Sequence, residues 1–279
     1  MDFYYSSVGG KIPIIDDSPD AMALIHPGAG VGYGAVPRDY SVQPEAMFDD
    51  PSSMTIIDPS EYDARYDEDE ANESSLEHLY LSGPGKTPRF ENLDQNGQPY
   101  CWAFSSTHAV MMLRLAMNQP LVRLSAHAIG CKVMDFREEG GWSGLSAQFL
   151  REKGVPSVEF WKEKSMARSN DKSETWENAA LHKVTEHWID LTKKVYDQTM
   201  SMKAAATCLI NRTPTPMDFS WWSHAVCAIR HVRIEPGSWG WLILNSWENW
   251  GRHGLGVIRG SKTNFMGAVS LRVTGASTN

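Results

Sequence analysis

Three side chains far apart in the sequence have neighbours that suit a nucleophilic reaction. The first is Cys101, which follows the turn-forming residues NGQP and opens the run CWAFSSTHAV, a predicted helix. A helix N-terminus lowers the pKa of a thiol, and the thiolate is the form that attacks. Many free cysteines are only small buried side chains, so a packing role at the helix start is the alternative for Cys101.

A neighbouring histidine also lowers the pKa of a thiol, and the chain has nine histidines. His224 stands out because it opens a predicted apolar strand, HAVCAIRHVRI, soon after two tryptophans. It is either a base held away from water or a histidine of the core.

Asn245 ends another apolar strand, LILN, two residues before Trp247. Its amide oxygen can accept the ring N–H of a histidine and set the tautomer, while a tryptophan ring shields that bond. The alternative for Asn245 is a strand-ending turn with tryptophans packed on the core.

Two glutamines precede the cysteine, Gln95 by six residues and Gln98 by three. A side-chain amide beside a nucleophile can donate a hydrogen bond to an oxyanion, together with the backbone N–H of the cysteine. The residues by themselves leave the choice between the two glutamines open.

The predicted helices come before the predicted strands. Helical patterns occupy residues 101–117, 125–136 and 144–154, and one or both of 174–188 and 192–210. Short apolar strands follow at residues 224–234, 239–247, 254–260 and 267–273. This order predicts an α+β protein with two subdomains in residues 86–279, a mainly helical one at about 86–205 and a mainly β one at about 206–279.

Residues 1–85 differ from the rest of the chain and are predicted to form an extended irregular N-terminal arm, rich in glycine and proline. Residues 1–80 contain 17 acidic residues and three basic ones, a net charge of −14, whereas the remainder carries +6. The run YDARYDEDEANESSLEH within the arm predicts a solvated loop. We expect such an arm to be ordered only where it lies against its own basic body or against a partner protein.

The composition excludes several classes of protein. No apolar run approaches the ~18 to 20 residues of a membrane span, and the N-terminus lacks the features of a standard secretory signal. The four cysteines form no CxxC pair, which predicts neither a metal site nor a disulfide scaffold, and no cofactor is expected. A cytoplasmic or virion-associated protein is therefore expected. Nucleic acid binding is not predicted, because the chain has no basic–aromatic motif.

The segments QNGQPYCWAFS, SHAV and NSWENWGRHG together resemble the papain family of cysteine peptidases, over roughly residues 86–275. The resemblance implies Cys101 as the nucleophile, His224 as the base and Asn245 as the residue that orients it. It selects Gln95 over Gln98 for the oxyanion. It also implies a papain-like fold, with a helical left subdomain, a β-barrel-like right subdomain and the site in the cleft between them.

The resemblance extends to residues around the catalytic ones. It implies that Gly140, Gly141 and Trp142 line the main specificity pocket, and that Trp102 and Trp247 support the site.

Several positions depart from the family pattern. Glu248 stands where glycine is usual, and the spacer that follows it is one residue shorter. Gln98 and Glu139 stand where secreted members carry disulfide cysteines, so the resemblance implies that those disulfides are absent. The arm does not resemble the helical propeptide of the family. Disulfide-poor members with a WWxHAV motif resemble proteins of bacteria and their phages.

The resemblance implies a cysteine endopeptidase that cleaves a protein or peptide substrate. A second hypothesis is a structural or assembly protein, for example a virion component, that keeps the fold with or without peptidase activity. A third is a cell-wall amidase of another thiol-hydrolase family, which the Asn-Ser-Trp element of this chain disfavours.

Overall fold

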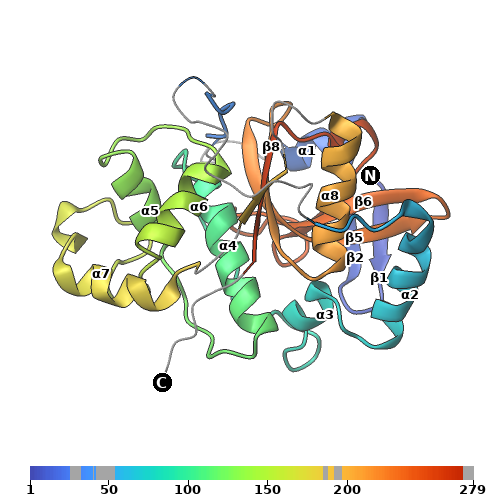
Figure 1. Cartoon of the computed structure of the whole chain (residues 1–279), viewed down its shortest axis with the longest axis horizontal. Helices are drawn as coiled ribbons and strands as arrows, with labels where there is room; N and C mark the ends of the chain where they lie inside the picture. Colours follow the sequence, from blue (N-terminus) through green and yellow to red (C-terminus); the bar gives the residue numbers. More distant parts are fainter. Residues whose placement is uncertain (26–32, 40, 42–53, 185–187, 192–196, 273–279) are drawn as a thin grey trace.

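The computed structural model describes residues 1–25, 33–39, 41, 54–184, 188–191 and 197–272. The protein is α+β, with a group of helices on one side and the strands on the other (Figure 1). None of the helices in these ranges combines the length and apolarity needed to cross a bilayer.

The helical side is built around a long central helix, α4 (Cys101–Ala116), which is buried along nearly its whole length. Around it lie α5 (Ala126–Val133), α6 (Ser143–Glu152) and α7 (Ser173–Ala179). Helix α6 ends at Glu152, and Gly154 adopts a positive φ of +83° directly after the C-cap residue Lys153.

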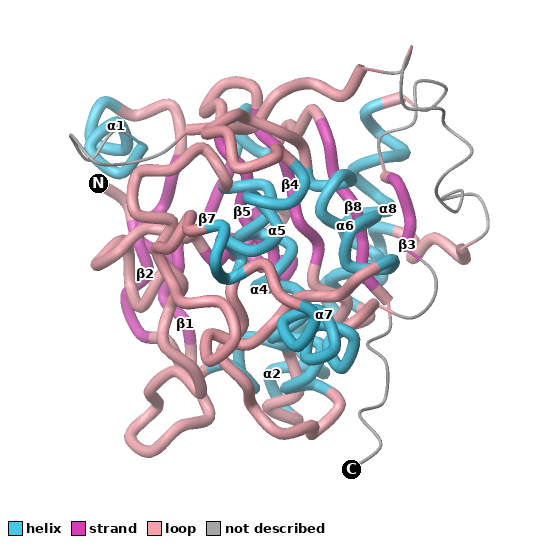
Figure 2. Tube along the Cα trace, turned by 90° about the vertical axis from the view of Figure 1, so that its left-hand side faces the viewer, coloured by secondary structure: helices cyan, strands magenta, loops and turns pink. Residues whose placement is uncertain are grey.

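The described strands form one sheet in the order β1-β2-β7-β6-β5-β4-β8-β3 (Figure 2). Neighbours are antiparallel except for β2 and β7. The strands are β1 (Phe3–Ser6), β2 (Gly10–Ile15), β3 (Trp188–Asp190), β4 (Thr215–Phe219), β5 (His224–Glu235), β6 (Ser238–Leu244), β7 (Leu255–Arg259) and β8 (Gly267–Leu271).

Both faces of the sheet are covered. Along β5, Ala225 and Cys227 belong to the core shared with α4, whereas Val226 and Ala228 belong to a second core. This alternation is what a strand buried on both faces requires, because successive side chains point to opposite sides. Helix α8 (Gln198–Ile210) contributes to the second core.

The arm contains regular structure. Besides β1 and β2 it forms the short helices η1 (Pro19–Ala21), α1 (Met22–Ile25), η4 (Pro59–Glu61), α2 (Tyr62–Ala71) and α3 (Leu76–Tyr80). The prediction of a solvated loop for the acidic run is wrong, since most of that run is α2. Two of its aspartates, Asp63 and Asp67, pair with Arg233 of β5, and these contacts offset the charge repulsion within the helix.

The helices predicted at residues 101–117, 125–136 and 144–154 are confirmed, as are the strands from residue 224 onwards. Both mixed segments contain a helix, although residues 185–187, 192–196 and 273 of the predicted elements lie outside the described ranges. Strands β3 and β4 are elements that sequence patterns did not predict. The division of the chain into an arm and two subdomains stays a prediction.

Candidate active site

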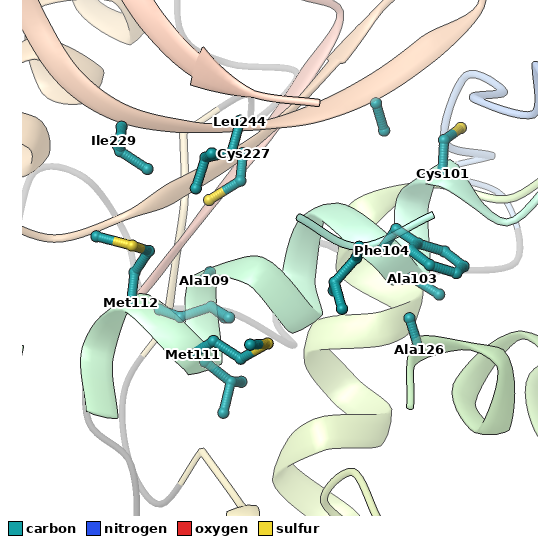
Figure 3. Packing of buried hydrophobic residues seen from close by; sticks show 14 of the residues in the cluster. Cys101, Ala103, Phe104, Ala109, Met111, Met112, Ala126, Cys227, Ile229 and Leu244 are labelled. Carbon is teal, nitrogen blue, oxygen red and sulfur yellow. The ribbon is translucent and has the colours of Figure 1, made fainter. Parts of the chain in front are cut away.

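Cys101 is the first residue of α4 and is fully buried. Asn96 and Gly97, both at positive φ, turn the chain just before the helix, which then begins after Tyr100. The Cys101 sulfur points away from the packed side chains of Ala103 and Phe104 (Figure 3). All four cysteines are free thiols.

His224 and Asn245 are brought together from 21 residues apart. The Oδ1 atom of Asn245 lies 2.7 Å from Nε2 of His224 and accepts the backbone N–H of Ser246 at 2.7 Å. Because this oxygen is an acceptor, Nε2 of the imidazole carries the proton. The opposite ring nitrogen, Nδ1, is then unprotonated, and it has no hydrogen-bond partner in the described part of the chain.

Aromatic rings enclose the imidazole of His224. Trp247 stacks on it at 4.4 Å between ring centroids, with 30° between the planes, and Trp222 approaches to 4.9 Å. Tyr33 of the arm meets its edge at 6.2 Å. These rings exclude water from the bond between His224 and Asn245, as the sequence predicts for Trp247.

The thiol of Cys101 lies against the backbone of Ala225, the residue after His224, and against the backbone of Gly34 in the arm. Among the described residues, no hydrogen bond joins the thiol to the imidazole. Burial raises the pKa of Cys101 to about 12 and lowers the pKa of His224 to about 4. Both groups are therefore neutral at pH 7, since burial outweighs the helix N-terminus.

Gln95 is buried and tied to the segment that follows Asn245. Its backbone N–H donates to the Ser246 carbonyl at 2.9 Å, and its Oε1 accepts from the Ser246 hydroxyl at 2.7 Å. Its Nε2 donates to the carbonyl of Gln98 at 2.6 Å. The backbone carbonyl of Gln98 therefore helps to fix the position of the Gln95 side-chain amide.

Residues 33–36 of the arm lie across this site. The backbone N–H groups of Gly34 and Ala35 donate to the Ser223 carbonyl, both at 3.0 Å. Gly141 donates to the Gly34 carbonyl at 2.8 Å and accepts from Val36 at 2.9 Å, which makes a parallel bridge with Ala35. The arm therefore spans from the residue before His224 to the predicted pocket glycine, over Cys101.

The glycines of this region permit close approaches that a side chain would prevent. A Cβ atom on Gly141 would lie 2.6 Å from the Trp102 ring, and one on Gly140 would lie 2.6 Å from the Gly34 carbonyl oxygen. Trp102 in turn donates its Nε1–H to the Pro99 carbonyl at 3.1 Å. Gly140, Gly141 and Trp102 thus form one wall against which the arm lies.

Trp142, next to this wall, belongs to a buried cluster that sequence reasoning missed. The cluster consists of Trp142, Asp190 and the neighbouring Asp218, and is called the acidic pocket below because the Arg38 side chain lies in it. Arg38 of the arm lies over the Trp142 ring, with its guanidinium carbon 4.5 Å from the centroid, and forms an ion pair with Asp190 of β3. The side chains of Arg38 and Asp190 are only 5% and 1% exposed, so this pair is closed off from solvent.

A second carboxyl, Asp218 of β4, is buried next to this pair and accepts from the Ser143 hydroxyl at 2.7 Å. Burial raises the pKa of Asp218 to about 7, and the charge of Asp190 adds to this shift. The sequence signal that could have identified Asp218 is its position as the single acidic residue of the segment TPMDF. The structure shows that all five residues of this segment are buried.

Comparisons with known proteins identify relatives. The model of the papain family cysteine proteases matches residues 93–274. Among solved structures, xylellain, a cysteine protease from Xylella fastidiosa, superposes with a TM-score of 0.59 at 17% identity, over 88% of this chain and 97% of that one. Digestive procathepsin L 3 of Tenebrio molitor larval midgut gives 0.51 at 16% identity, over 91% and 78%. A search of curated proteins finds no significant match.

At these identities the two solved structures establish a shared fold, which confirms the predicted α+β papain-like architecture. The family model spans most of the chain and includes Cys101, His224 and Asn245. The chain therefore belongs to the papain family of cysteine proteases.

Proposed function

We propose that this cysteine peptidase cleaves peptide bonds within proteins through Cys101, His224, Asn245 and Gln95, and that its arm holds it in a latent form. The observation that carries the proposal is the 2.7 Å contact between His224 and Asn245, which keeps the proton on Nε2 and leaves Nδ1 as a base.

In the proposed reaction, Nδ1 of His224 takes the proton of the Cys101 thiol, and the sulfur attacks the carbonyl carbon of the scissile bond. The oxyanion that forms accepts hydrogen bonds from the Gln95 side-chain amide and the Cys101 backbone N–H. The latter is among the first amides of α4, which have no partner within the helix.

Collapse of this intermediate breaks the carbon–nitrogen bond, and the imidazolium of His224 gives its proton to the leaving amine. Water, deprotonated by the same nitrogen, then attacks the thioester and releases the acid product and the thiol. Asn245 retains its hydrogen bond to Nε2 throughout and stabilises the imidazolium.

Latency is proposed because the arm lies where a substrate must lie. The backbone of Gly34 is against the thiol, and Gly141 already makes both of its main-chain hydrogen bonds to the arm. Withdrawal of residues 33–36 admits water and substrate, and so reverses the burial that keeps Cys101 and His224 neutral. The packing of the arm on its own body is part of this proposal.

The test is labelling by a thiol-directed epoxide together with hydrolysis of a fluorogenic peptide panel. We expect one labelled site in the native chain, formed slowly because the arm has to move, and no labelling or hydrolysis in Cys101→Ala. Cys208→Ala, which removes another buried thiol, is the matched control and should behave like the native chain. Labelling that persists in Cys101→Ala overturns the assignment of the nucleophile.

The occluded site also favours the second hypothesis, a structural or assembly protein that keeps the fold. That hypothesis predicts no turnover of any peptide, even after the arm is released, and a stable complex in size-exclusion chromatography of the same sample.

A further inference from the structure

A cation occupies the acidic pocket next to Gly141. The guanidinium of Arg38 lies over the Trp142 ring and forms an ion pair with the Asp190 carboxylate. An arginine placed over an aromatic face and paired with a carboxylate is well matched in shape and charge. The acidic pocket therefore contains a basic side chain in this structure, that of Arg38.

The main chain of residues 34–36 pairs with Gly141 through backbone hydrogen bonds, which a peptide substrate could also form. Gly34 and Val36, the residues on either side of Ala35, make two backbone hydrogen bonds to Gly141, and these do not depend on the side chains of the bound segment. Trp142, the residue after Gly141, forms one wall of the acidic pocket with its ring. A peptide strand bound at Gly141 thus brings its side chains within reach of Asp190, because an extended chain advances only about 3.3 Å per residue.

The carboxylate of Asp190 favours a positive charge in the acidic pocket. Asp190 and Asp218 are both buried, and each is 1% exposed or less. A buried carboxylate without a counter-charge is strongly unfavourable. An apolar side chain that displaced Arg38 would remove the positive charge that pairs with Asp190, whereas an arginine or lysine would restore the ion pair. Such a pocket discriminates mainly by rejecting the uncharged side chain.

We propose that Trp142, Asp190 and Asp218 form a subsite that selects a basic side chain of the substrate, close to the residue that pairs with Gly141. This inference rests on the proposed peptidase function and names its substrate class, peptides with arginine or lysine near the cleaved bond. Arg38 occupies the subsite in the latent chain.

The experiment uses the full chain carrying Arg38→Ala, which vacates the subsite. Its substrates are fluorogenic peptides in which one arginine replaces norleucine at each position in turn on the amino side of the cleaved bond. We expect one position at which arginine raises kcat/KM at least about tenfold, and Asp190→Asn to abolish that gain. Asp190→Glu, which keeps the charge, should retain most of it and guards against a simple folding defect.

The matched control is Asp171→Asn, which removes a carboxylate from an ion pair with Lys132 on the helical side. It should leave the arginine preference unchanged. Cleavage with no arginine preference, or with a preference that Asp190→Asn leaves intact, overturns the subsite but not the peptidase.

A binding measurement separates the two proposals. Fluorescence anisotropy of the same labelled peptides is measured on Cys101→Ala combined with Arg38→Ala, where no reaction is needed. Tighter binding of the arginine peptide that disappears with Asp190→Asn supports the subsite even if no variant cleaves, in which case only the peptidase proposal fails. Equal or absent binding of the two peptides to this variant overturns the subsite.

Discussion

At the scale of single residues, Asn245 decides what His224 can do. Its Oδ1 atom accepts two N–H groups, one from the Ser246 backbone and one from the imidazole. The backbone contact fixes the orientation of the amide, so the amide in turn fixes the proton on Nε2. The Trp247 ring, stacked on the imidazole, holds its plane. In the proposed mechanism, His224 is therefore a base that is aligned before any substrate arrives.

We therefore predict that Asn245→Ala lowers kcat about 10- to 100-fold and changes KM little, because an unanchored imidazole samples the wrong tautomer and orientation. Asn245→Asp, which can still accept the ring N–H, should recover part of the loss. The measurement is steady-state hydrolysis of a fluorogenic peptide. The exposed Asn264→Ala is the control. An unchanged kcat in Asn245→Ala contradicts the proposed orienting role.

At the scale of elements, the arm is fastened to the body by ion pairs of very different burial. Arg230 of β5 is 3% exposed and pairs with Glu77 of α3, which is fully buried and also bonded to Ser6. Arg65 on α2, by contrast, is half exposed, and its partners among the described residues are Glu61 and Glu68 of the arm itself. The first pair ties α3 to the sheet, while the second lies in solvent.

We predict that Glu77→Ala lowers the free energy of unfolding by about 3 kcal/mol, because it leaves the Arg230 charge buried with one partner fewer. Arg65→Ala, which removes an exposed ion pair, should change it by no more than about 0.5 kcal/mol. Urea unfolding followed by tryptophan fluorescence measures both. Equal losses in the two variants contradict the role assigned to burial.

The same reasoning applies to residues 33–38, whose side-chain anchor is the buried pair between Arg38 and Asp190. Arg38→Ala should raise the rate at which an epoxide labels Cys101 by about tenfold or more, since each 1.4 kcal/mol of lost anchoring is tenfold in the population of the released arm.

The control for this prediction is Arg212→Ala, which removes an arginine that pairs with Asp69 of α2. Its labelling rate should match that of the native chain. An unchanged rate in Arg38→Ala means that the arm is held by its main-chain hydrogen bonds alone.

At the scale of the whole molecule, the most general consequence of burial is a sensitivity to acid. Burial lowers the pKa of five histidines far below 6.5, to about 3 or 4; they are His108, His127, His182, His224 and His231. The unfolded chain takes up these protons near pH 6.5, before the folded chain does. Their contribution to stability is therefore complete above pH 6.5 and is lost as the pH falls toward 4. Asp218 opposes them, since its raised pKa favours the folded state at low pH, but it is one group against five.

We predict that the free energy of unfolding falls steeply between pH 6.5 and 4.5, each buried histidine contributing up to about 1.4 kcal/mol per pH unit. Urea unfolding at a series of pH values measures the slope. His231→Phe keeps a ring between Trp239 and Trp241 and removes one titrating group, so its slope should be shallower. A stability that does not change between pH 7 and 5 contradicts the prediction.

The sequence by itself determined the local features of this protein. The turn before Cys101, the periodicity of α4, and the apolar strands at His224 and before Asn245 can all be predicted from residues close together in the sequence. Local patterns suffice there, because helix starts and strand ends depend on residues within a few positions.

Only the tertiary structure decided which groups meet across the chain and what burial does to them. Arg38 and Asp190 are 152 residues apart, and the pairing of acidic α2 with β5 spans a similar distance. No periodicity encodes such contacts, because they form only when distant elements pack together. The neutral state of Cys101 and His224 has the same origin, because the burial that shifts the pKa of both groups comes from elements that pack together only in the folded chain.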